Sequence, residues 1–269
     1  MPAKKVMVTG VWGLIGGEIY RHLQKTPERY EAYGLSRRPQ PSERVRPDRV
    51  LEIPEGKFVH SDLSDLNQVT RALQGTDVVV HMAADPSGER GWESVLHSNI
   101  IGAYNIFEGS RLAGVKRVIC ASSVQVSSGY RKEEPYSRVT KSPGQGLPPD
   151  VAPVSHTWPT RPTNIYACSK IWGEALARAY SDTHGLSCIC LRIGWVLAED
   201  RPPRPESNDI WCSQRDIVQL AQRCIDARDS LRFDIFYGMS DNRGRWVDIS
   251  HARDAVGYVP QDRAEERSA

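Results

Sequence analysis

The sequence has no long hydrophobic run and almost no net charge. No apolar stretch approaches the ~20 residues that a membrane-spanning helix needs, and 35 Lys and Arg against 33 Asp and Glu leave a formal charge of +2. We therefore expect neither a membrane span nor the basic field with which proteins bind nucleic acid. Residues 1–8 also lack the apolar core and cleavage site of a signal peptide, which predicts a cytoplasmic protein.

Cysteine and histidine are too scattered to suggest a metal site. The six cysteines form no Cys-x-x-Cys pair, and most lie in apolar stretches where a free thiol behaves as a small hydrophobic side chain. The seven histidines do not combine with them at zinc-ligand spacings. We therefore predict free structural thiols and no metal site.

What the sequence does contain is the composition and pattern of a globular α/β protein. Of its 269 residues, 39% are apolar and 25% are charged. Runs rich in β-branched residues alternate with segments of helical period, which predicts a Rossmann-type doubly wound parallel sheet covered by helices. The expected strands are 5–9, 30–36, 57–60, 77–82, 116–121, 186–193 and 233–237. The expected helices are 13–24, 65–74, 92–113, 164–184 and 213–227.

Two irregular segments interrupt this alternation. We expect one Rossmann-fold domain over residues 1–269, with substrate-loop insertions at about 127–162 and 195–212 and a small C-terminal part from about 195 to 269. The first insertion is rich in proline, and a loop of that length without structure is unusual unless it forms a lid or a binding loop. Both insertions follow strands, and ligands of doubly wound sheets bind at the carboxyl ends of the strands.

A glycine-rich loop, Gly10-Val11-Trp12-Gly13-Leu14-Ile15-Gly16, follows the first expected strand and opens the first expected helix. Glycine lets the backbone turn sharply there and lets a pyrophosphate approach the amides at a helix N-terminus. An ordinary strand-to-helix turn can also carry three glycines. The position after the first strand of an α/β chain favours a dinucleotide site.

The residues that would read the ribose of a dinucleotide lie about 20 residues farther on. There the sequence has Ser36-Arg37-Arg38, where an NAD-binding chain usually has an acid. Serine and a guanidinium fork accept a 2′-phosphate, so we expect NADP in preference to NAD. The alternative is that Arg37 and Arg38 only solvate a surface loop.

Further cofactor candidates stand at the ends of the next two strands. Asp62 can accept a hydrogen bond from the adenine amino group. Met82, Ala83 and Ala84 end the fourth strand with small residues, beside which a cofactor can pass close to the backbone. Ala83 and Ala84 would equally suit simple packing against a helix.

A candidate catalytic set follows the fifth strand. Ser122-Ser123 ends that strand, and Tyr166 and Lys170 have the i, i+4 spacing that places them on one face of a helix. A neighbouring ammonium and a nicotinamide cation favour the phenolate form of tyrosine. Tyr166 can then take a proton from a substrate hydroxyl while hydride leaves the adjacent carbon, and Ser123 can hold the same oxygen.

As an ordered set these motifs resemble the extended branch of the short-chain dehydrogenase/reductase superfamily, the NAD-dependent epimerase/dehydratase family. The resemblance covers about residues 5–195, and its further segments are Asn99-Ile100-x-Gly102 and Leu191-Arg192-Ile193-Gly194. It implies that Ser123, Tyr166 and Lys170 are catalytic, and that Asn99 is a structural or relay residue. The cofactor-binding residues it implies are Gly10, Gly13, Leu14, Ile15, Gly16, Ser36, Arg37, Arg38, Asp62, Leu63, Met82, Ala83, Ala84, Asn99, Tyr166, Lys170 and Ile193.

Within this family the sequence is most similar to uronate dehydrogenases and related sugar 1-dehydrogenases, through segments such as 99–105 and the ending Gly257-Tyr258-x-Pro260. Only about 75 residues follow Gly194, which leaves little room to bind a nucleoside diphosphate. Val124-Gln125 stands where uronate dehydrogenases have Asn-His, so the sugar itself stays open.

The resemblance also implies an arginine, in the loop after Gly194, that holds a substrate carboxylate. Arg201 and Arg204 are the candidates, although both would also suit a solvated loop, and Trp195 beside them would suit either an apolar pocket or the core. The substrate-binding residues that we expect are Ser87, Ser123, Val124, Gln125, Trp195, Arg201 and Arg204.

The sequence therefore predicts an NAD(P)-dependent oxidoreductase, with NADP favoured, that acts on a small molecule. By resemblance the reaction is oxidation of a sugar or uronic acid at C1 to a lactone. The alternatives are a carbonyl reductase of an apolar ketone or aldehyde, a nucleotide-sugar epimerase, and a non-catalytic NADP-binding sensor. Relatives often dimerise through the helices that correspond to 92–113 and 164–184, so we expect a homodimer.

Overall fold

The computed structural model describes residues 2–86, 88–142 and 144–267. Within these ranges seven parallel strands form one sheet in the order β3-β2-β1-β4-β5-β6-β7. They are β1 (Lys4–Thr9), β2 (Tyr30–Ser36), β3 (Phe58–His60), β4 (Val78–His81), β5 (Arg117–Ser123), β6 (Ser187–Ile193) and β7 (Phe233–Gly238). Each expected strand is present to within two residues at its ends. The strand order reverses between β1 and β4, as in doubly wound folds, which confirms the Rossmann-type α/β fold.

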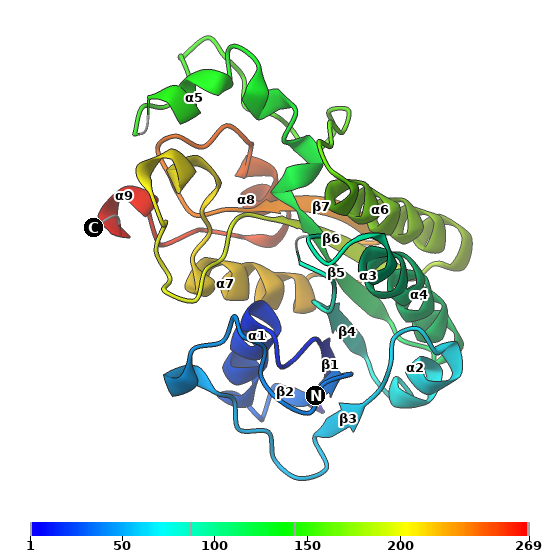
Figure 1. Cartoon of the computed structure of the whole chain (residues 1–269). Coiled ribbons are helices and arrows are strands. Elements are labelled where there is room, and N and C mark those ends of the chain that lie inside the picture. Colours follow the sequence, from blue (N-terminus) through cyan, green and yellow to red (C-terminus); the bar gives the residue numbers. More distant parts are fainter. Residues whose placement is uncertain (1, 87, 143, 268–269) are drawn as a thin grey trace.

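Helices cover both faces of this sheet, as Figure 1 shows. The longer ones are α1 (Leu14–Gln24), α2 (Leu66–Ala72), α4 (Gly102–Leu112), α6 (Ile165–His184) and α7 (Gln214–Ile225). Helices α1 and α7 pack together on one face, and α2, α4 and α6 pack side by side on the other. None of the helices that the structure describes has the length and apolar character to span a bilayer.

The strands divide their side chains between two cores because successive residues of a strand point to opposite faces. In β1, Val6 and Val8 pack toward α1 and α7, whereas Met7 packs toward α2, α4 and α6. Cys188 and Cys190 of β6 are two residues apart, so both lie on the face that packs toward α2, α4 and α6. All six cysteines are free, and five of them are buried.

The prediction of one continuous helix over 92–113 is wrong in the middle of that range. The structure has α3 (Trp92–Val95), a π-helical segment (Leu96–Ile101) and then α4. The wide π-turn carries the buried Asn99, whose side chain bonds to neighbouring segments rather than to its own helix. A single π-turn inside an α-helix often marks a functional site, and hydrophobic period alone does not reveal it.

The proline-rich insertion and the C-terminal part share a third core. Val124, Val139, Val154 and Trp246 belong to it. Val154 forms an isolated parallel bridge with Val247 and donates its N–H to the Trp246 carbonyl at 2.8 Å. The short helices of this region are α5 (Ser137–Lys141), α8 (Ser250–Val256) and α9 (Ala264–Arg267), which the periodicity did not predict.

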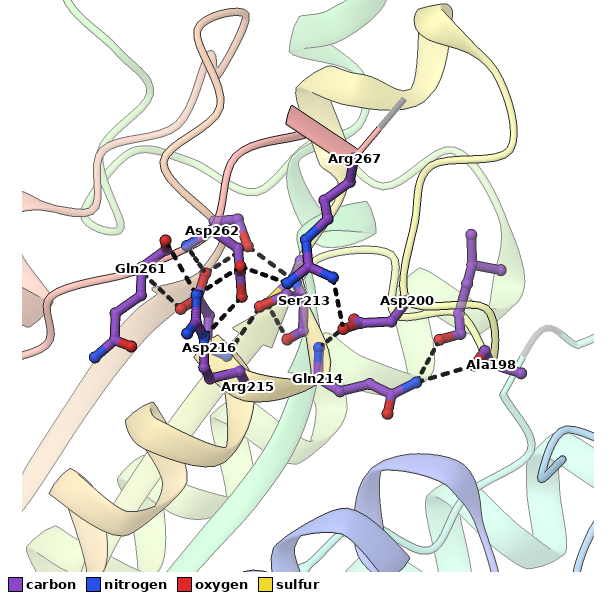
Figure 2. A network of polar contacts seen from close by, with 12 residues as sticks. Ala198, Asp200, Ser213, Gln214, Arg215, Asp216, Gln261, Asp262 and Arg267 are labelled. Atoms are coloured by element: carbon purple, nitrogen blue, oxygen red, sulfur yellow. Dashed lines mark hydrogen bonds and ion pairs between the residues drawn. The ribbon is translucent and has the colours of Figure 1, made fainter. Parts of the chain in front are cut away.

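A polar network fixes the loop after β6 to the N-terminus of α7 and to the C-terminal segment (Figure 2). The Gln214 N–H donates to Asp200 Oδ1 at 2.8 Å, and its side-chain amide donates to the Leu197 carbonyl at 2.8 Å. Arg267 lies 3.9 Å from the Asp200 carboxylate and donates to Asp262 Oδ1 at 2.8 Å. The loop is therefore held by α7 and by the chain's last described residues.

Candidate active site

A cavity of about 1090 Å³ lies at the carboxyl ends of the strands. Its walls come from the segments that follow β1 to β6 and from the N-terminal turns of α6. Ligands of open α/β sheets bind at this edge, next to the point where the strand order reverses. One cavity thus brings together most of the residues that the sequence motifs single out.

The glycine loop between β1 and α1 forms one wall of the cavity. Gly10 has φ +67°, and a Cβ atom there would lie 2.8 Å from Ala83 Cα. A Cβ atom on Gly16 would collide with the Gly10 carbonyl oxygen. The amides of Leu14 and Ile15 belong to the first turn of α1, where N–H groups lack helical partners. The bare backbone and the helix N-terminus fit the pyrophosphate of a dinucleotide.

Beside this loop the cavity contains Ser36 at the end of β2 and the two arginines that follow it. Ser36 Oγ accepts the Arg38 N–H at 3.2 Å, and neither Arg37 nor Arg38 has a side-chain ion pair among the described residues. Asp62 lines the same region, and a hydrogen bond from the Ser64 N–H lowers the pKa of its carboxyl group. This end therefore offers two free guanidinium groups and one ionised acceptor.

Ser123, Tyr166 and Lys170 all line the cavity and are nearly buried. Ser123 is the last residue of β5, and its Oγ accepts the Gln125 N–H at 3.2 Å. Lys170 Nζ donates to the Ala121 carbonyl at 3.0 Å and lies 5.5 Å from the centroid of the Tyr166 ring. A serine, a tyrosine and a buried ammonium thus face one cavity, as proton transfer at a substrate oxygen requires.

Asn99 is not among the residues that line the cavity. Its Oδ1 accepts the Asp85 N–H at 2.7 Å, and its Nδ2 donates to Ser169 Oγ at 3.0 Å. Ser169 Oγ in turn donates to the Tyr166 carbonyl at 2.7 Å. Asn99 therefore connects the loop after β4 to the first turn of α6, and it does not line the cavity as the cofactor-binding role expected of it would require.

A neutral histidine lies beneath the cavity floor. His81 shares a 2.8 Å hydrogen bond with Thr9 Oγ1, which also accepts the Ala83 N–H at 3.2 Å. Burial, with a smaller effect of the Lys170 charge, lowers the pKa of His81 to about 3. His81 is therefore uncharged at neutral pH. Through Thr9 it supports the backbone at Ala83, which lines the cavity.

A buried ion pair contacts Ser122, the residue before Ser123, and the sequence motifs gave no role for it. Glu174 of α6 and Arg192 of β6 form two 2.9 Å hydrogen bonds at 6% and 2% exposure. Ser122 Oγ donates to Glu174 at 2.6 Å, and Arg192 Nη1 donates to the Tyr237 hydroxyl at 3.0 Å. The one sequence signal was a charged residue, Arg192, next to the end of the largely apolar strand β6.

Three expected substrate residues, Val124, Gln125 and Trp195, line the cavity. Gln125 Oε1 accepts from Asn164 Nδ2 at 2.7 Å, which ties the segment after β5 to the N-cap of α6. Trp195 forms an isolated bridge with Trp211, and its side chain is 36% exposed. The structure thus brings these three residues into the same cavity as Ser123.

Arg201 and Arg204 do not reach the cavity. Both are exposed and neither is among its lining residues. The neighbouring Asp200 contacts Gln214 and Arg267, which holds this part of the loop against α7 and the C-terminal segment (Figure 2). Ser87 lies outside the described residues.

Other residues line the cavity without having been predicted. They are polar, charged or aromatic side chains from the second strand's loop, the fourth strand's loop, the proline-rich insertion and the C-terminal part, and include Arg44, Arg90, Arg131, Lys132, Thr140 and Trp246. The one sequence signal for any of them was the adjacent pair Arg131-Lys132 near the start of the insertion. Trp246 had none, because only the tertiary fold brings it to this wall.

His156, Asp234 and His251 approach one another outside the cavity, with ligand atoms within 4.8 Å. His251 Nε2 lies 2.7 Å from Asp234 Oδ1, and the two imidazole rings stack at 3.9 Å between centroids and 10° between planes. Lone pairs in nearly parallel, stacked rings do not meet at one point. In this arrangement the cluster joins the insertion to β7 and α8 instead of presenting a formed metal site.

Comparison with known proteins gives one family. Residues 6–256 match the NAD dependent epimerase/dehydratase family. The chain is 33% identical to the NAD-dependent glucose-6-phosphate dehydrogenase of Haloferax volcanii, over 97% of this chain and 94% of that protein. It is 34% identical to the L-arabinose 1-dehydrogenase (NAD(P)(+)) of the same organism, over 75% of this chain and 80% of that protein.

A solved structure gives the same result. A variant of uronate dehydrogenase from Agrobacterium tumefaciens, complexed with NAD, matches with a TM-score of 0.76 at 29% identity. The match covers 98% of this chain and 87% of that one. These proteins share the dehydrogenase reaction and differ in the sugar derivative that their names carry.

Proposed function

This chain belongs to the NAD-dependent epimerase/dehydratase family and is an oxidoreductase of the dehydrogenase type, and we propose that it oxidises a sugar or uronic acid at C1 to the lactone. The observation that carries the proposal is that Ser123, Tyr166 and Lys170 line the same cavity as the glycine loop. The relatives that are named after sugars and sugar derivatives support C1 of a sugar as the reacting carbon.

In this reaction Tyr166 takes the proton of the C1 hydroxyl group. When bound, the nicotinamide ring supplies the acceptor for the hydride that leaves C1. Ser123 forms a hydrogen bond to the reacting oxygen and holds it beside Tyr166. Lys170, fixed by the Ala121 carbonyl, keeps a positive charge beside the Tyr166 ring, and this charge stabilises the phenolate.

The glycine loop fits a dinucleotide, because Cβ atoms at Gly10 and Gly16 would fill the space that its backbone leaves. A helix N-terminus at this loop stabilises phosphate charge. The residues that we propose to hold the cofactor, all of which line the cavity, are Gly10, Gly13, Leu14, Ile15, Gly16, Ser36, Arg37, Arg38, Asp62, Leu63, Met82, Ala83, Ala84, Tyr166, Lys170 and Ile193.

Among the nicotinamide cofactors we propose NADP in preference to NAD. Ser36 stands at the end of β2 in place of an acid, and the guanidinium groups of Arg37 and Arg38, which form no ion pair with the residues that the structure describes, suit a 2′-phosphate. The same loop also contributes an acid, Glu43, to the cavity lining. Glu43 lies seven residues beyond Ser36 and not at the end of β2. The relatives' names carry both NAD and NAD(P)+.

The test is a turnover assay at the absorbance band of reduced nicotinamide, with NAD and NADP each offered against aldoses, uronates, sugar phosphates and apolar ketones. We expect reduction of NADP with at least one sugar and slower reduction of NAD. Tight NADPH binding without turnover of any compound would replace the dehydrogenase by a cofactor-binding sensor.

A carbonyl reductase of an apolar substrate is the second candidate. Val124, Trp195 and Trp246 line the cavity beside the polar residues, and they offer an apolar surface for such a substrate. Turnover confined to apolar ketones or aldehydes in the same assay would favour it over the sugar dehydrogenase.

We also propose that two chains associate through α4 and α6. These helices pack side by side and expose Tyr104, Leu112, Ile165 and Trp172 at their surface. Exposed large apolar side chains on neighbouring helices are typical of an interface. Light scattering after gel filtration should give twice the chain mass of 30.1 kDa, and a mass of one chain would reject the dimer.

A further inference from the structure

Two adjacent cations of the proline-rich insertion, Arg131 and Lys132, line the cavity. They belong to the 3₁₀ turn Tyr130–Lys132, which follows β5 and the catalytic Ser123. We propose that Arg131 and Lys132 form an anion-binding subsite, so that the substrate is a sugar that carries a carboxylate or a phosphate group. This inference rests on the sugar dehydrogenase function proposed above, and it assigns a role to the insertion.

The guanidinium group of Arg131 is held in one orientation. Its Nε and Nη2 donate to the two oxygens of Asp209 at 2.5 and 2.9 Å, and Nη2 also donates to the Glu206 carbonyl at 2.8 Å. Asp209 is 2% exposed and accepts a third hydrogen bond, from Trp246 Nε1 at 3.0 Å. Nη1 has no partner among the described residues. A guanidinium fixed on one edge is a preorganised donor on the other.

Lys132 supplies a charge that no neighbouring acid neutralises. The two acids that follow it are both engaged elsewhere: Glu133 pairs with Arg161 at 2.7 Å, and Glu134 pairs with Arg138 at 2.6 Å. Within the described part of the chain, Lys132 has no ion pair of its own. Because the pair Arg131–Asp209 is close to neutral, Lys132 contributes most of the positive charge of the subsite.

The residues that line the cavity carry a larger relative excess of positive charge than the whole chain does. Among the described residues that line it, the Lys and Arg side chains outnumber the Asp and Glu side chains by seven to four, although the whole chain is nearly balanced. The cations are Arg37, Arg38, Arg44, Arg90, Arg131, Lys132 and Lys170, and the acids are Glu43, Asp62, Asp85 and Glu89. A cleft of one sign concentrates ligands of the opposite sign.

Uncharged polar groups line the cavity together with these cations. Gln125 and Ser128 lie in the chain between Ser123 and Arg131, and Thr163, which precedes α6, lies with its Oγ1 2.9 Å from Ser128 Oγ. These groups suit the hydroxyls of a sugar ring. A sugar with C1 at Tyr166 would then direct the substituent at its other end toward the subsite.

The experiment measures selectivity between charged and neutral sugars. The kcat/KM values for D-glucuronate, D-glucose 6-phosphate and D-glucose are compared in the wild type and in Lys132→Met. The control is Lys141→Met, since Lys141 belongs to the same insertion, contacts Glu134 at 3.3 Å and does not line the cavity. Arg131→Met is measured as well, but it leaves the buried Asp209 without its cation, so Lys132→Met decides.

We expect the wild type to prefer one of the anionic sugars, and Lys132→Met to lower the ratio of anionic to neutral kcat/KM by about 10-fold. Lys141→Met should leave the ratio unchanged. The glucuronate arm and the phosphate arm show which anion is bound. An equal ratio in wild type and Lys132→Met, or a wild type that prefers glucose, would overturn the subsite and leave the dehydrogenase function standing.

Failure of the proposed function gives a different result. If none of the three sugars is oxidised, calorimetry of D-glucuronate and D-glucose 6-phosphate with the protein saturated by NADPH tests the subsite directly. Binding that weakens about 10-fold in Lys132→Met would still support the anion subsite. Absence of binding, or equal binding by both proteins, would overturn it.

Discussion

The two ends of the cavity are built from the chain in different ways. At the cofactor end, the glycine loop, Ser36 and Ala83 each lie at the end of a strand or within two residues of it, so one strand and one turn place each of them. At the substrate end, Arg131 is oriented by Asp209, which is 78 residues away, and Asp209 is bonded to Trp246. The first end is a series of local motifs, whereas the second exists only once the tertiary structure has formed.

Between the two ends lies a buried junction. Glu174 and Arg192 join α6 to β6, and through Ser122 and Tyr237 they reach the catalytic strand and the third core. The comparison therefore predicts three kinds of substitution: those that stop the chemistry, those that weaken the junction, and those that alter one end alone.

The largest effect is expected for Tyr166→Phe. Loss of the proton acceptor should lower kcat about 1000-fold, while the affinity for NADPH stays within about twofold, because the aromatic ring, Lys170 and the glycine loop all remain. Steady-state kinetics and a fluorescence titration with NADPH measure the two quantities. Tyr180→Phe is the control. Tyr180 lies on the same helix, donates a hydrogen bond to Glu108 at 2.9 Å and does not line the cavity. Retention of a tenth of the activity would remove Tyr166 as the base.

The junction should be the most sensitive to removal of a single charge. Glu174→Ala leaves the buried Arg192 without its counterion, which should destabilise the protein by about 3 kcal/mol. Urea unfolding measures the change. Asp182→Ala is the matched control on α6, because its ion pair with Arg178 is exposed and should contribute less than about 1 kcal/mol. Equal losses in the two variants would show that the junction does not hold the two ends together.

The same contrast explains what the sequence could predict. All seven strands and the positions of Ser123, Tyr166 and Lys170 follow from period and spacing, because each depends on a few neighbouring residues. The placement of Arg201 and Arg204 does not, since a contact from Asp200 to Gln214 decides the side on which the loop lies.

At the substrate end, the sequence shows the charged residues but not which of them pair with one another. The pair Arg131-Lys132 is visible in the sequence, but so are the acids Glu133 and Glu134 that follow it. Which of the four charges remains free depends on Arg161 and other cations that only the fold brings near. The π-turn around Asn99 was missed for a related reason, because its cause is a set of bonds to Asp85 and Ser169.

A change confined to the cofactor end should separate the two dinucleotides. Arg37→Ala should weaken NADP binding about 10-fold by removing a charge-assisted hydrogen bond to phosphate, and should leave NAD binding unchanged. Arg46→Ala is the control, because Arg46 pairs with Asp48 on the same loop and does not line this cavity. Dissociation constants from calorimetry decide, and an equal loss for NADP and NAD would defeat the phosphate clamp.

Acid should also act on the cofactor end, through His81. Burial lowers the pKa of His81 from 6.5 to about 3, so between these values the unfolded chain binds a proton that the folded protein excludes. Stability is therefore complete above about pH 6.5 and falls as the pH decreases, by about 1.4 kcal/mol per pH unit once the unfolded histidine is charged. Urea unfolding at pH 7.0, 6.0 and 5.0 measures the slope.

His81→Gln isolates this contribution, because the exposed acids and bases titrate in the variant as they do in the wild type. The variant should be less stable at pH 7 and should lose less stability on acidification, so that the two curves converge toward pH 5. His156, whose pKa burial also lowers, belongs to the insertion and is unchanged in the variant. Parallel curves would show that His81 does not cause the acid sensitivity, which would then arise from other groups such as His156.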